Sequence, residues 1–111
     1  MVNIDKYRNT IQRVIKQYAD ERPLPNNIEK QTVFDTERDH YQLIHVGWNN
    51  DTWIYGCVLH IDLKNDKVWI QYNGSEVEIA DELIKAGIPE KQIVIGFHSP
   101  YKRKFTKFAE C

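Results

Sequence analysis

Apolar positions near the N-terminus recur every three or four residues. This spacing places one apolar stripe on a helix. The stripe consists of Ile4, Tyr7, Ile11, Val14, Ile15 and Tyr18. Asn3 or Asp5 can cap the first turn of this helix, because a side-chain oxygen there accepts from an unpaired amide. Pro23 and Pro25 require the helix to end near Glu21.

The middle of the chain alternates between apolar and polar positions, as half-buried strands do. Four strands are predicted, over residues 32–36, 41–48, 52–63 and 67–72. Short polar turns at 49–51 and 65–66 separate the last three, which predicts an antiparallel meander with an apolar face that needs a cover. Gly56 in the longest strand indicates a bulge or a close approach to another backbone.

Strict alternation assigns the apolar side chains of two strands to single faces. One face of the 52–63 strand is predicted to carry Trp53, Tyr55, Cys57, Leu59, Ile61 and Leu63. One face of the 67–72 strand is predicted to carry Val68, Ile70 and Tyr72. Both expectations follow from the two-residue period of a strand without irregularities.

A second helix is predicted after the sheet and supplies part of its cover. Its apolar stripe is Ile79, Ala80, Leu83 and Ile84. Ser75, followed by Glu78 three residues later, has the pattern of a capping box, and Gly87 is placed to end the helix. An extended apolar segment follows at 93–97. The sequence therefore predicts one α+β domain over residues 1–111, an antiparallel β-meander sheet with the N-terminal helix and the second helix packed on it.

Composition narrows the function classes. The chain has 111 residues and a net charge of −1, so no global field draws it to nucleic acid or membrane. Cys57 and Cys111 do not form a disulfide framework, which favours a reducing compartment. No stretch approaches the roughly 18–20 apolar residues of a membrane span, and the N-terminus has no apolar signal core. We expect a cytoplasmic protein without membrane attachment.

The stretch "DTERDH" at 35–40 gathers acids, a base and an imidazole. It has the composition of an active site, but it also lies between two predicted strands, where polar turns are common. We favour a structural turn in which Asp35, Glu37, Arg38 and Asp39 bond to backbone amides and to one another. Under this interpretation these carboxylates do not converge with a histidine such as His40.

Metal binding has one weak signal in the strands. His60 and Asp62 are two residues apart and share a face, and His45 is a candidate third ligand on the neighbouring strand. "HIDLK" also contains Asp62 and Lys64, which loosely resemble the carboxylate and lysine of metal-dependent nucleases. The sequence has neither HExxH nor paired cysteines. We therefore expect no catalytic residue, no cofactor and no metal site.

The C-terminal segment "PYKRKFTKF" interleaves cations with aromatic residues. Its cations are Lys102, Arg103, Lys104 and Lys107. They are candidate contacts for phosphates or an acidic partner. Alternatively, Phe105 and Phe108 anchor the segment on the core and the cations stay in water, which is the interpretation that we favour. Three Trp and six Tyr are many for one small core, and surface aromatics favour protein interfaces.

Long stretches of the chain resemble the XisI family. They are "VFDTERDHYQL" at 33–43, "VGW" at 46–48, "GCVLHIDLKNDKVWIQ" at 56–71, "IADELIKAGIP" at 79–89 and "IVIGFHSPYKRKFTKFA" at 93–109. Together they span essentially the whole chain. The family is described as the controlling factor for excision of the fdxN element, a programmed DNA rearrangement in heterocyst-forming cyanobacteria. The resemblance implies a role beside a XisF recombinase and a nuclease-related XisH protein, and it carries over no catalytic residue.

The residues and the resemblance together predict an accessory or regulatory protein that acts by contact. The expected partner is a XisH-like protein, in excision or in another role such as a toxin–antitoxin-like pair. A homo-oligomer is also expected, because a small sheet covered on one face leaves the other face for a partner. Two alternatives stay open: a metal-dependent, nuclease-like enzyme that uses Asp35, Glu37 or His60, and direct DNA binding through the C-terminal cations.

Overall fold

A computed structural model describes residues 3–25 and 27–111. Helix α1 (Ile4–Glu21) begins at Asn3, whose side chain accepts the Lys6 amide at 3.1 Å. The predicted cap and the predicted end of this helix are confirmed. Its buried side is formed by Tyr7, Thr10, Ile11, Val14, Ile15 and Ala19.

Five strands form one sheet in the order β1-β2-β3-β4-β5. Their bounds are β1 (Ile28–Asp35), β2 (His40–Asn49), β3 (Thr52–Lys64), β4 (Lys67–Asn73) and β5 (Ile93–Ile95). The first four are antiparallel neighbours, which confirms the meander, and β1 begins four residues before the predicted start. The segment predicted to be extended at 93–97 contributes β5, which lies parallel to β4. This direction requires a long crossover, and residues 74–92 supply it.

Helix α2 (Ile79–Lys85) lies within that crossover. The predicted capping box is wrong: the N-cap is Glu78, which makes no side-chain cap bond. Ser75 lies too early, in the turn after β4, where its hydroxyl donates to Asn73 and to the Val77 carbonyl. Gly87 ends the helix with φ of 109°, as predicted.

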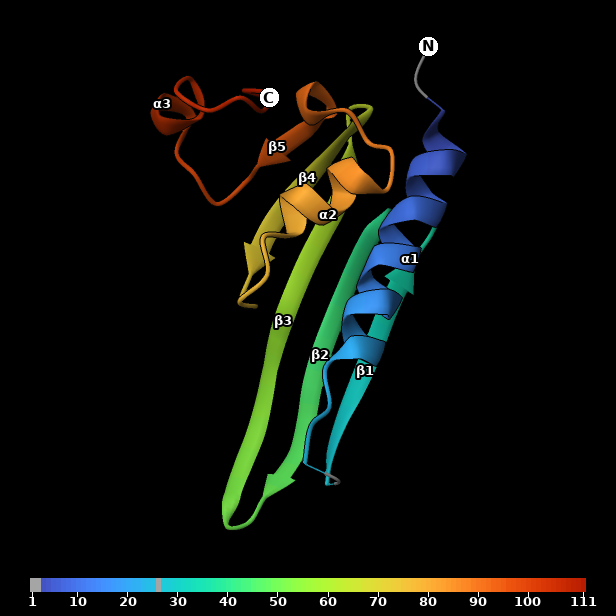
Figure 1. The fold of residues 1–111 in the computed structure, drawn as a ribbon, viewed down its shortest axis with the longest axis vertical. Coiled ribbons are helices and arrows are strands. Elements are labelled where there is room, and N and C mark those ends of the chain that lie inside the picture. The colour runs from blue at the N-terminus through green and yellow to red at the C-terminus, as the bar shows by residue number, and fades with distance from the viewer. Residues whose placement is uncertain (1–2, 26) are drawn as a thin grey trace.

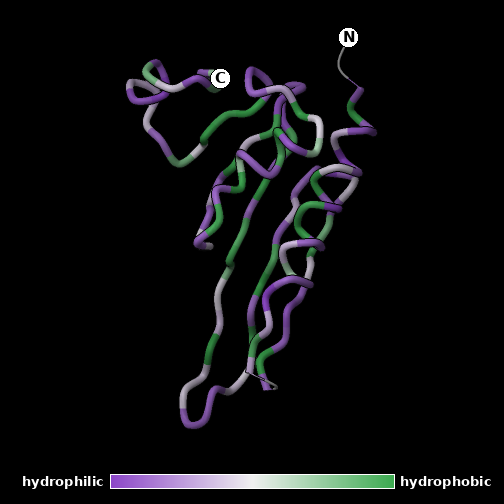
Figure 2. The backbone as a smooth tube through the Cα atoms, in the orientation of Figure 1, coloured by the Kyte–Doolittle hydropathy of each residue, from purple (hydrophilic) through white to green (hydrophobic). Residues whose placement is uncertain are grey.

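Both helices cover the same face of the sheet (Figure 1). Hydrophobic and hydrophilic stretches alternate along β2 and β3, and β5 is hydrophobic throughout (Figure 2). Where β2 and β3 are buried, every second side chain enters the core. The sheet residues in this core include Tyr41, Leu43, Leu59, Ile61, Val68, Ile70, Ile93 and Ile95. They pack against the buried residues of α1 and α2. The opposite face, named the outer face below, carries neither of these helices.

Two irregularities change the predicted faces of β3 and β4. The pairing of β2 with β3 shifts between Leu43 and Ile44, which leaves Val58 as an extra residue in β3. A second shift, at His60 and Ile61, leaves Gln71 as the extra residue in β4. Each bulge reverses the alternation. The prediction of single apolar faces is therefore wrong. In β3, the outer face carries Trp53, Tyr55 and Cys57, whereas the core contains Leu59, Ile61 and Leu63. In β4, Tyr72 lies on the outer face, whereas Val68 and Ile70 lie in the core.

Close backbone packing in this region occurs at Gly47 and not at Gly56, where it was expected. No atom of the described residues lies within 4 Å of a Cβ placed on Gly56, so the close approach predicted there is wrong. The bulge is two residues away, at Val58. Gly47 is the crowded position instead, because β1 crosses directly beside it.

The chain ends in a short 3-10 turn (Glu90–Gln92), β5 and helix α3 (Pro100–Arg103). Ser99 caps α3 by accepting the Lys102 amide at 3.2 Å. Among the described residues, no helix is both long enough and apolar enough to cross a membrane.

Candidate functional site

The outer face combines an apolar strip with a polar cluster. The strip consists of Val33, Ile44, Val46, Trp48, Trp53, Tyr55, Cys57 and Tyr72, and the cluster of His40, Gln42, His60, Asp62 and Gln71. Their neighbours Tyr41, Leu43, Leu59 and Ile61 are fully buried beneath the helices. Alternation along the strands therefore directs the strip and the cluster away from the core.

The apolar strip is unusually exposed for large side chains. Tyr55 is 68% exposed, and Trp48 and Trp53 are 53% exposed each. The two indoles pair across the β2–β3 hairpin with ring centroids 5.3 Å apart, beside a depression of about 600 Å³ that reaches β1. Contiguous exposed apolar surface of this kind marks a protein interaction site more often than it marks free surface.

The polar cluster centres on the Asp62 carboxylate. His40 Nδ1 and His60 Nε2 each lie 2.8 Å from Asp62 Oδ1, and the Gln71 amide donates to Oδ2 at 3.2 Å. Gln42 Nε2 lies 3.4 Å from the other ring nitrogen of His60. Burial raises the pKa of Asp62, but the bonds from His40, His60 and Gln71 outweigh burial, and the net pKa is lowered.

The hypothesis that His45 is the third metal ligand beside His60 and Asp62 is wrong, because His40 occupies that position. His40 lies directly opposite Asp62 in the β2–β3 pairing, whereas His45 lies opposite Gly56 and points to the helix side. His45 Nε2 is buried without a hydrogen-bond partner among the described residues, and burial followed by the Lys30 charge lowers the pKa of His45.

The turn at 35–40 behaves as a structural turn at its first positions. Asp35 Oδ1 accepts the amides of Glu37 at 3.0 Å and Arg38 at 2.9 Å, and the bond from the Arg38 amide lowers the pKa of Asp35. The Arg38 guanidinium lies 3.5 Å from Asp35 and 3.9 Å from Glu37. Neither Asp35 nor Glu37 belongs to the histidine cluster found among the described residues, whereas His60, the third residue of that alternative, does.

Asp39 differs from the expectation, because its bonds leave the turn. Its carboxylate accepts Arg8 Nε at 2.7 Å and Arg8 Nη2 at 3.1 Å, and it also accepts the Tyr41 hydroxyl at 2.7 Å. The Arg8 bond is the main cause of a lowered pKa of Asp39, and burial raises the pKa of Tyr41. A positive φ of 59° at Asp39 directs the carboxylate to this position. The group links the β1–β2 turn to α1.

The C-terminal cations have unequal surroundings. Arg103 donates to the carbonyls of Ile95, Gly96 and Glu110 at 3.2–3.4 Å, and its guanidinium lies over the Trp69 ring with a centroid distance of 5.1 Å. Lys107 lies 3.9 Å from Glu90, whereas Lys102 and Lys104 are exposed. Of the four cations, Arg103 is therefore a structural residue.

The aromatic anchor of the tail is only half as predicted. Phe108 is partly buried against the core, but the Phe105 ring is 73% exposed and packs beside Tyr101. The reason is the α3 turn, which points Phe105 away from the sheet. Arg103, with its three carbonyl bonds, takes the anchoring role that the sequence assigned to Phe105.

Replacing Arg103 with alanine should lower the free energy of unfolding by about 1–3 kcal/mol, because two partly buried carbonyls and one exposed carbonyl lose a charged donor. Urea unfolding followed by circular dichroism measures this loss. Lys102→Ala is the matched control on the same helix and should change stability by less than about 0.5 kcal/mol. Equal midpoints for the two variants would contradict the anchoring role.

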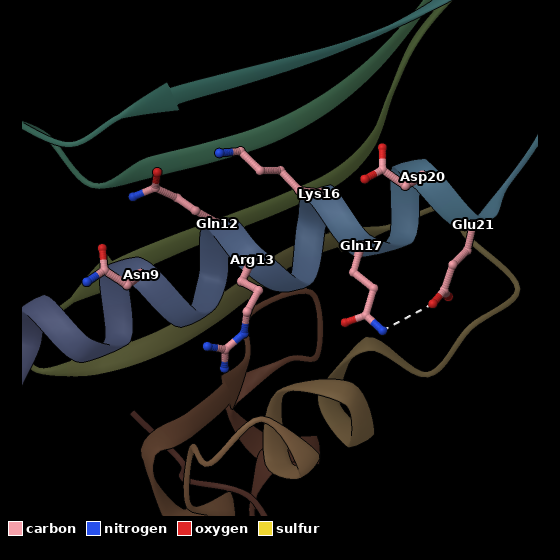
Figure 3. A pocket seen from close by; sticks show the side chains of 7 residues that line it. All are labelled: Asn9, Gln12, Arg13, Lys16, Gln17, Asp20 and Glu21. Atoms are coloured by element: carbon pink, nitrogen blue, oxygen red, sulfur yellow. Dashed lines mark hydrogen bonds between the residues drawn. The ribbon is translucent and has the colours of Figure 1, made fainter.

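Another depression, of about 570 Å³, follows the solvent-exposed side of α1. Figure 3 shows that all seven lining side chains come from this one helix and spread along both of its flanks. The hydrogen bond drawn there joins Gln17 to Glu21 at 3.1 Å. Polar side chains that diverge in this way form a hydrated helix surface and do not assemble a reactive site.

A family model for the XisI protein matches residues 1–110. The chain belongs to the XisI family. A XisI-like protein from Anabaena variabilis is 37% identical, with a TM-score of 0.91, over 96% of this chain and 98% of its own. The fdxN element excision controlling factor XisI from the same organism is 36% identical, with a TM-score of 0.81, over 96% and 97% of the two chains. A comparison with curated proteins finds no match.

Membership in the XisI family confirms the resemblance drawn from the sequence, and the solved structures share the α+β fold. Sequence reasoning did not find the roles of His40, Gln42 and Gln71. The signal for them is the bulge at Val58, which brings His40 opposite Asp62. The apolar pattern of the two strands is the sequence signal for this bulge. Tyr41 and Leu43 can pair with the apolar Ile61 and Leu59 only if the hairpin register shifts by one residue.

Proposed function

We propose that this XisI family protein is an accessory factor that controls DNA rearrangement by binding another protein through its outer face. The observation that carries the proposal is the exposed apolar strip. Three of its aromatic side chains, Trp48, Trp53 and Tyr55, are more than half exposed on one sheet face, and interfaces are enriched in such residues.

The charge of the outer face favours a protein over nucleic acid. The apolar strip is bordered by the acids Glu29, Asp35 and Asp62 of the same face, and the bases Lys64 and Lys67 lie beyond Asp62, at the end of the β3–β4 hairpin. Binding to DNA needs cations that neutralise phosphates, and acids at the border oppose it. Part of the basic tail is also occupied, since Arg103 bonds to backbone carbonyls and Lys107 lies near Glu90.

The proposed partner is a XisH-like protein. One solved relative carries the name fdxN element excision controlling factor, and a controlling factor needs a component of the excision machinery to act on. A nuclease-related XisH-like protein fits this need as a binding partner. In this proposal the present protein supplies contact and no chemistry of its own.

Co-expression with the XisH-like protein of the same genome tests the proposal. The wild-type protein should retain this partner on an affinity column, and Tyr55→Glu should weaken binding about 30- to 1,000-fold, as expected when a central aromatic contact worth 2–4 kcal/mol is lost. Tyr101→Glu is the matched control, because Tyr101 is 70% exposed but lies on α3. Isothermal titration with the purified partner gives the affinities.

Several outcomes would contradict the proposal. Equal losses for Tyr55→Glu and Tyr101→Glu would show that the outer face is not the contact surface. If the wild-type protein does not bind the partner but binds duplex DNA at physiological salt, the C-terminal cations would be the functional contact instead of the outer face. A homo-oligomer in light scattering that Tyr55→Glu dissociates would assign the face to a second copy of this chain.

A further inference from the structure

The polar cluster on the outer face has the ligand set of a transition-metal site. His40, His60 and Asp62 each offer one ligand atom, and these atoms all lie within 4.8 Å of one another. Two imidazoles and one carboxylate are a set that zinc and related divalent metals accept, while magnesium and calcium prefer oxygen ligands alone. From this juxtaposition we infer that the three side chains bind one divalent transition metal ion of the zinc class.

The scaffold of the site is rigid. His40 and Asp62 are directly opposite on β2 and β3, and His60 is two residues from Asp62 on the same strand. The Asp62 side chain is only 13% exposed, that of His60 30% and that of His40 53%. The sheet therefore fixes the ligand positions, while His40 keeps the site open to solvent.

Neighbouring amides hold two of the three ligands from outside. Gln71 donates to Asp62 Oδ2, which leaves Oδ1 directed at both imidazoles. Gln42 lies against His60 Nδ1, the nitrogen that does not face Asp62. Partners of this kind orient metal ligands and set the tautomer of a coordinating histidine.

The change needed for binding is small. Without metal, both ring nitrogens lie 2.8 Å from Asp62 Oδ1. Tetrahedral zinc with bonds of about 2.0–2.1 Å needs ligand atoms roughly 3.4 Å apart, so each imidazole nitrogen has to move roughly 0.6 Å away from Asp62 Oδ1. The two nitrogens, which lie within 4.8 Å of each other, have to reach the same spacing through side-chain rotations. Each neutral histidine shifts its proton to its other ring nitrogen, which for His60 faces the Gln42 amide, and the amide turns its oxygen to accept it.

Three protein ligands leave one position of a tetrahedral zinc ion for water or another donor. That position opens toward solvent on the side where His40 is exposed, beside the apolar strip. The inference stands on this cluster alone and does not depend on the proposed partner.

Zinc titration of chelator-treated, tag-free protein tests the site. The protein carries Cys57→Ser and Cys111→Ser, so that the free thiols do not bind the probe. We expect one Zn²⁺ per chain with an affinity in the micromolar range or tighter, and a rise in melting temperature with added zinc. Asp62→Asn and His40→Gln should each weaken binding by about 100-fold or more, since loss of outer partners alone costs about 10–100-fold.

His98→Gln is the control, because His98 lies after β5 and is not one of the three grouped ligands, so its loss should leave the affinity unchanged. Circular dichroism verifies that each variant is folded, and His40→Gln changes an exposed side chain that should not affect folding. Cobalt substitution, read by visible absorption, gives a second signal that the same variants should abolish. Failure to bind zinc, or binding that survives both Asp62→Asn and His40→Gln, would overturn the inference.

Discussion

Replacing Gly47 with alanine should lower the free energy of unfolding by about 3 kcal/mol, whereas the same change at Gly56 should not lower it. Gly47 has φ of 148°, which side chains rarely adopt, and a Cβ there would lie 2.0 Å from the Asn27 carbonyl oxygen and 2.9 Å from the Ile28 Cα. Strained backbone of this kind costs roughly 1–3 kcal/mol, and the backbone clash adds to it.

Gly56 is the matched control within the same sheet. A Cβ there meets no atom of the described residues within 4 Å, and alanine in a strand is roughly 0.5–1 kcal/mol better than glycine. Urea unfolding of both variants measures the difference. Because Gly47 pairs with Ile28, amide exchange in Gly47→Ala should also be fastest at the start of β1. Equal stability of the two variants would show that β1 does not approach Gly47 so closely.

Asp39→Ala should lower the free energy of unfolding by about 2–4 kcal/mol. The change leaves the buried Tyr41 hydroxyl without its acceptor and Arg8 without its carboxylate partner. Removing one member of a buried ion pair costs roughly 3–5 kcal/mol, and the value here is lower because the Arg8 side chain is 30% exposed. Asp39→Asn should cost less, because asparagine tolerates positive φ and still accepts from Tyr41.

The same carboxylate predicts a dependence on pH. Since Arg8 lowers the pKa of Asp39, its ionised form stabilises the folded state at every pH above the unfolded value of about 3.9. That stability is lost as the pH falls through the lower folded pKa. The stability difference between the wild-type protein and Asp39→Asn should thus be full at pH 7 and vanish well below pH 4. Asp20→Asn, an exposed change on α1, is the control; a difference that persists in acid would refute the ion pair.

The sequence predicts the regular parts of this fold well, because local chemistry determines them. Asn3 and Pro23 set the two ends of α1, and the turn at 65–66 uses residues that accept positive φ, 54° at Asn65 and 62° at Asp66. The start of β1 at Ile28 was missed, since Glu29 and Lys30 have low strand propensity and only pairing with β2 makes them extended.

The candidate site could not be predicted in full, because it depends on a bulge. Without the extra residue at Val58, the hairpin register would place Ile61 opposite His40, and the histidine would not meet a carboxylate. Strict alternation of apolar and polar residues along a strand does not indicate where an extra residue is inserted. The ion pair of Asp39 could not be predicted for a related reason. Its partner Arg8 is 31 residues away on a helix, and no local sequence pattern indicates that the two side chains meet.

The parallel pairing of β5 also bears on the order in which the chain folds. Consecutive strands from β1 to β4 are joined by turns of a few residues, so their ladders close small loops, whereas β5 reaches β4 only across residues 74–92. Contacts at larger separation form more slowly. During synthesis α1 and the meander emerge before α2 and β5, and the part of the core face that α2 and β5 cover, including Ile61 and Ile70, stays exposed until they arrive. A chain interrupted before residue 79 contains α1 but lacks α2 and β5, so it leaves part of its apolar sheet face exposed, as in intermediates that aggregate or recruit chaperones.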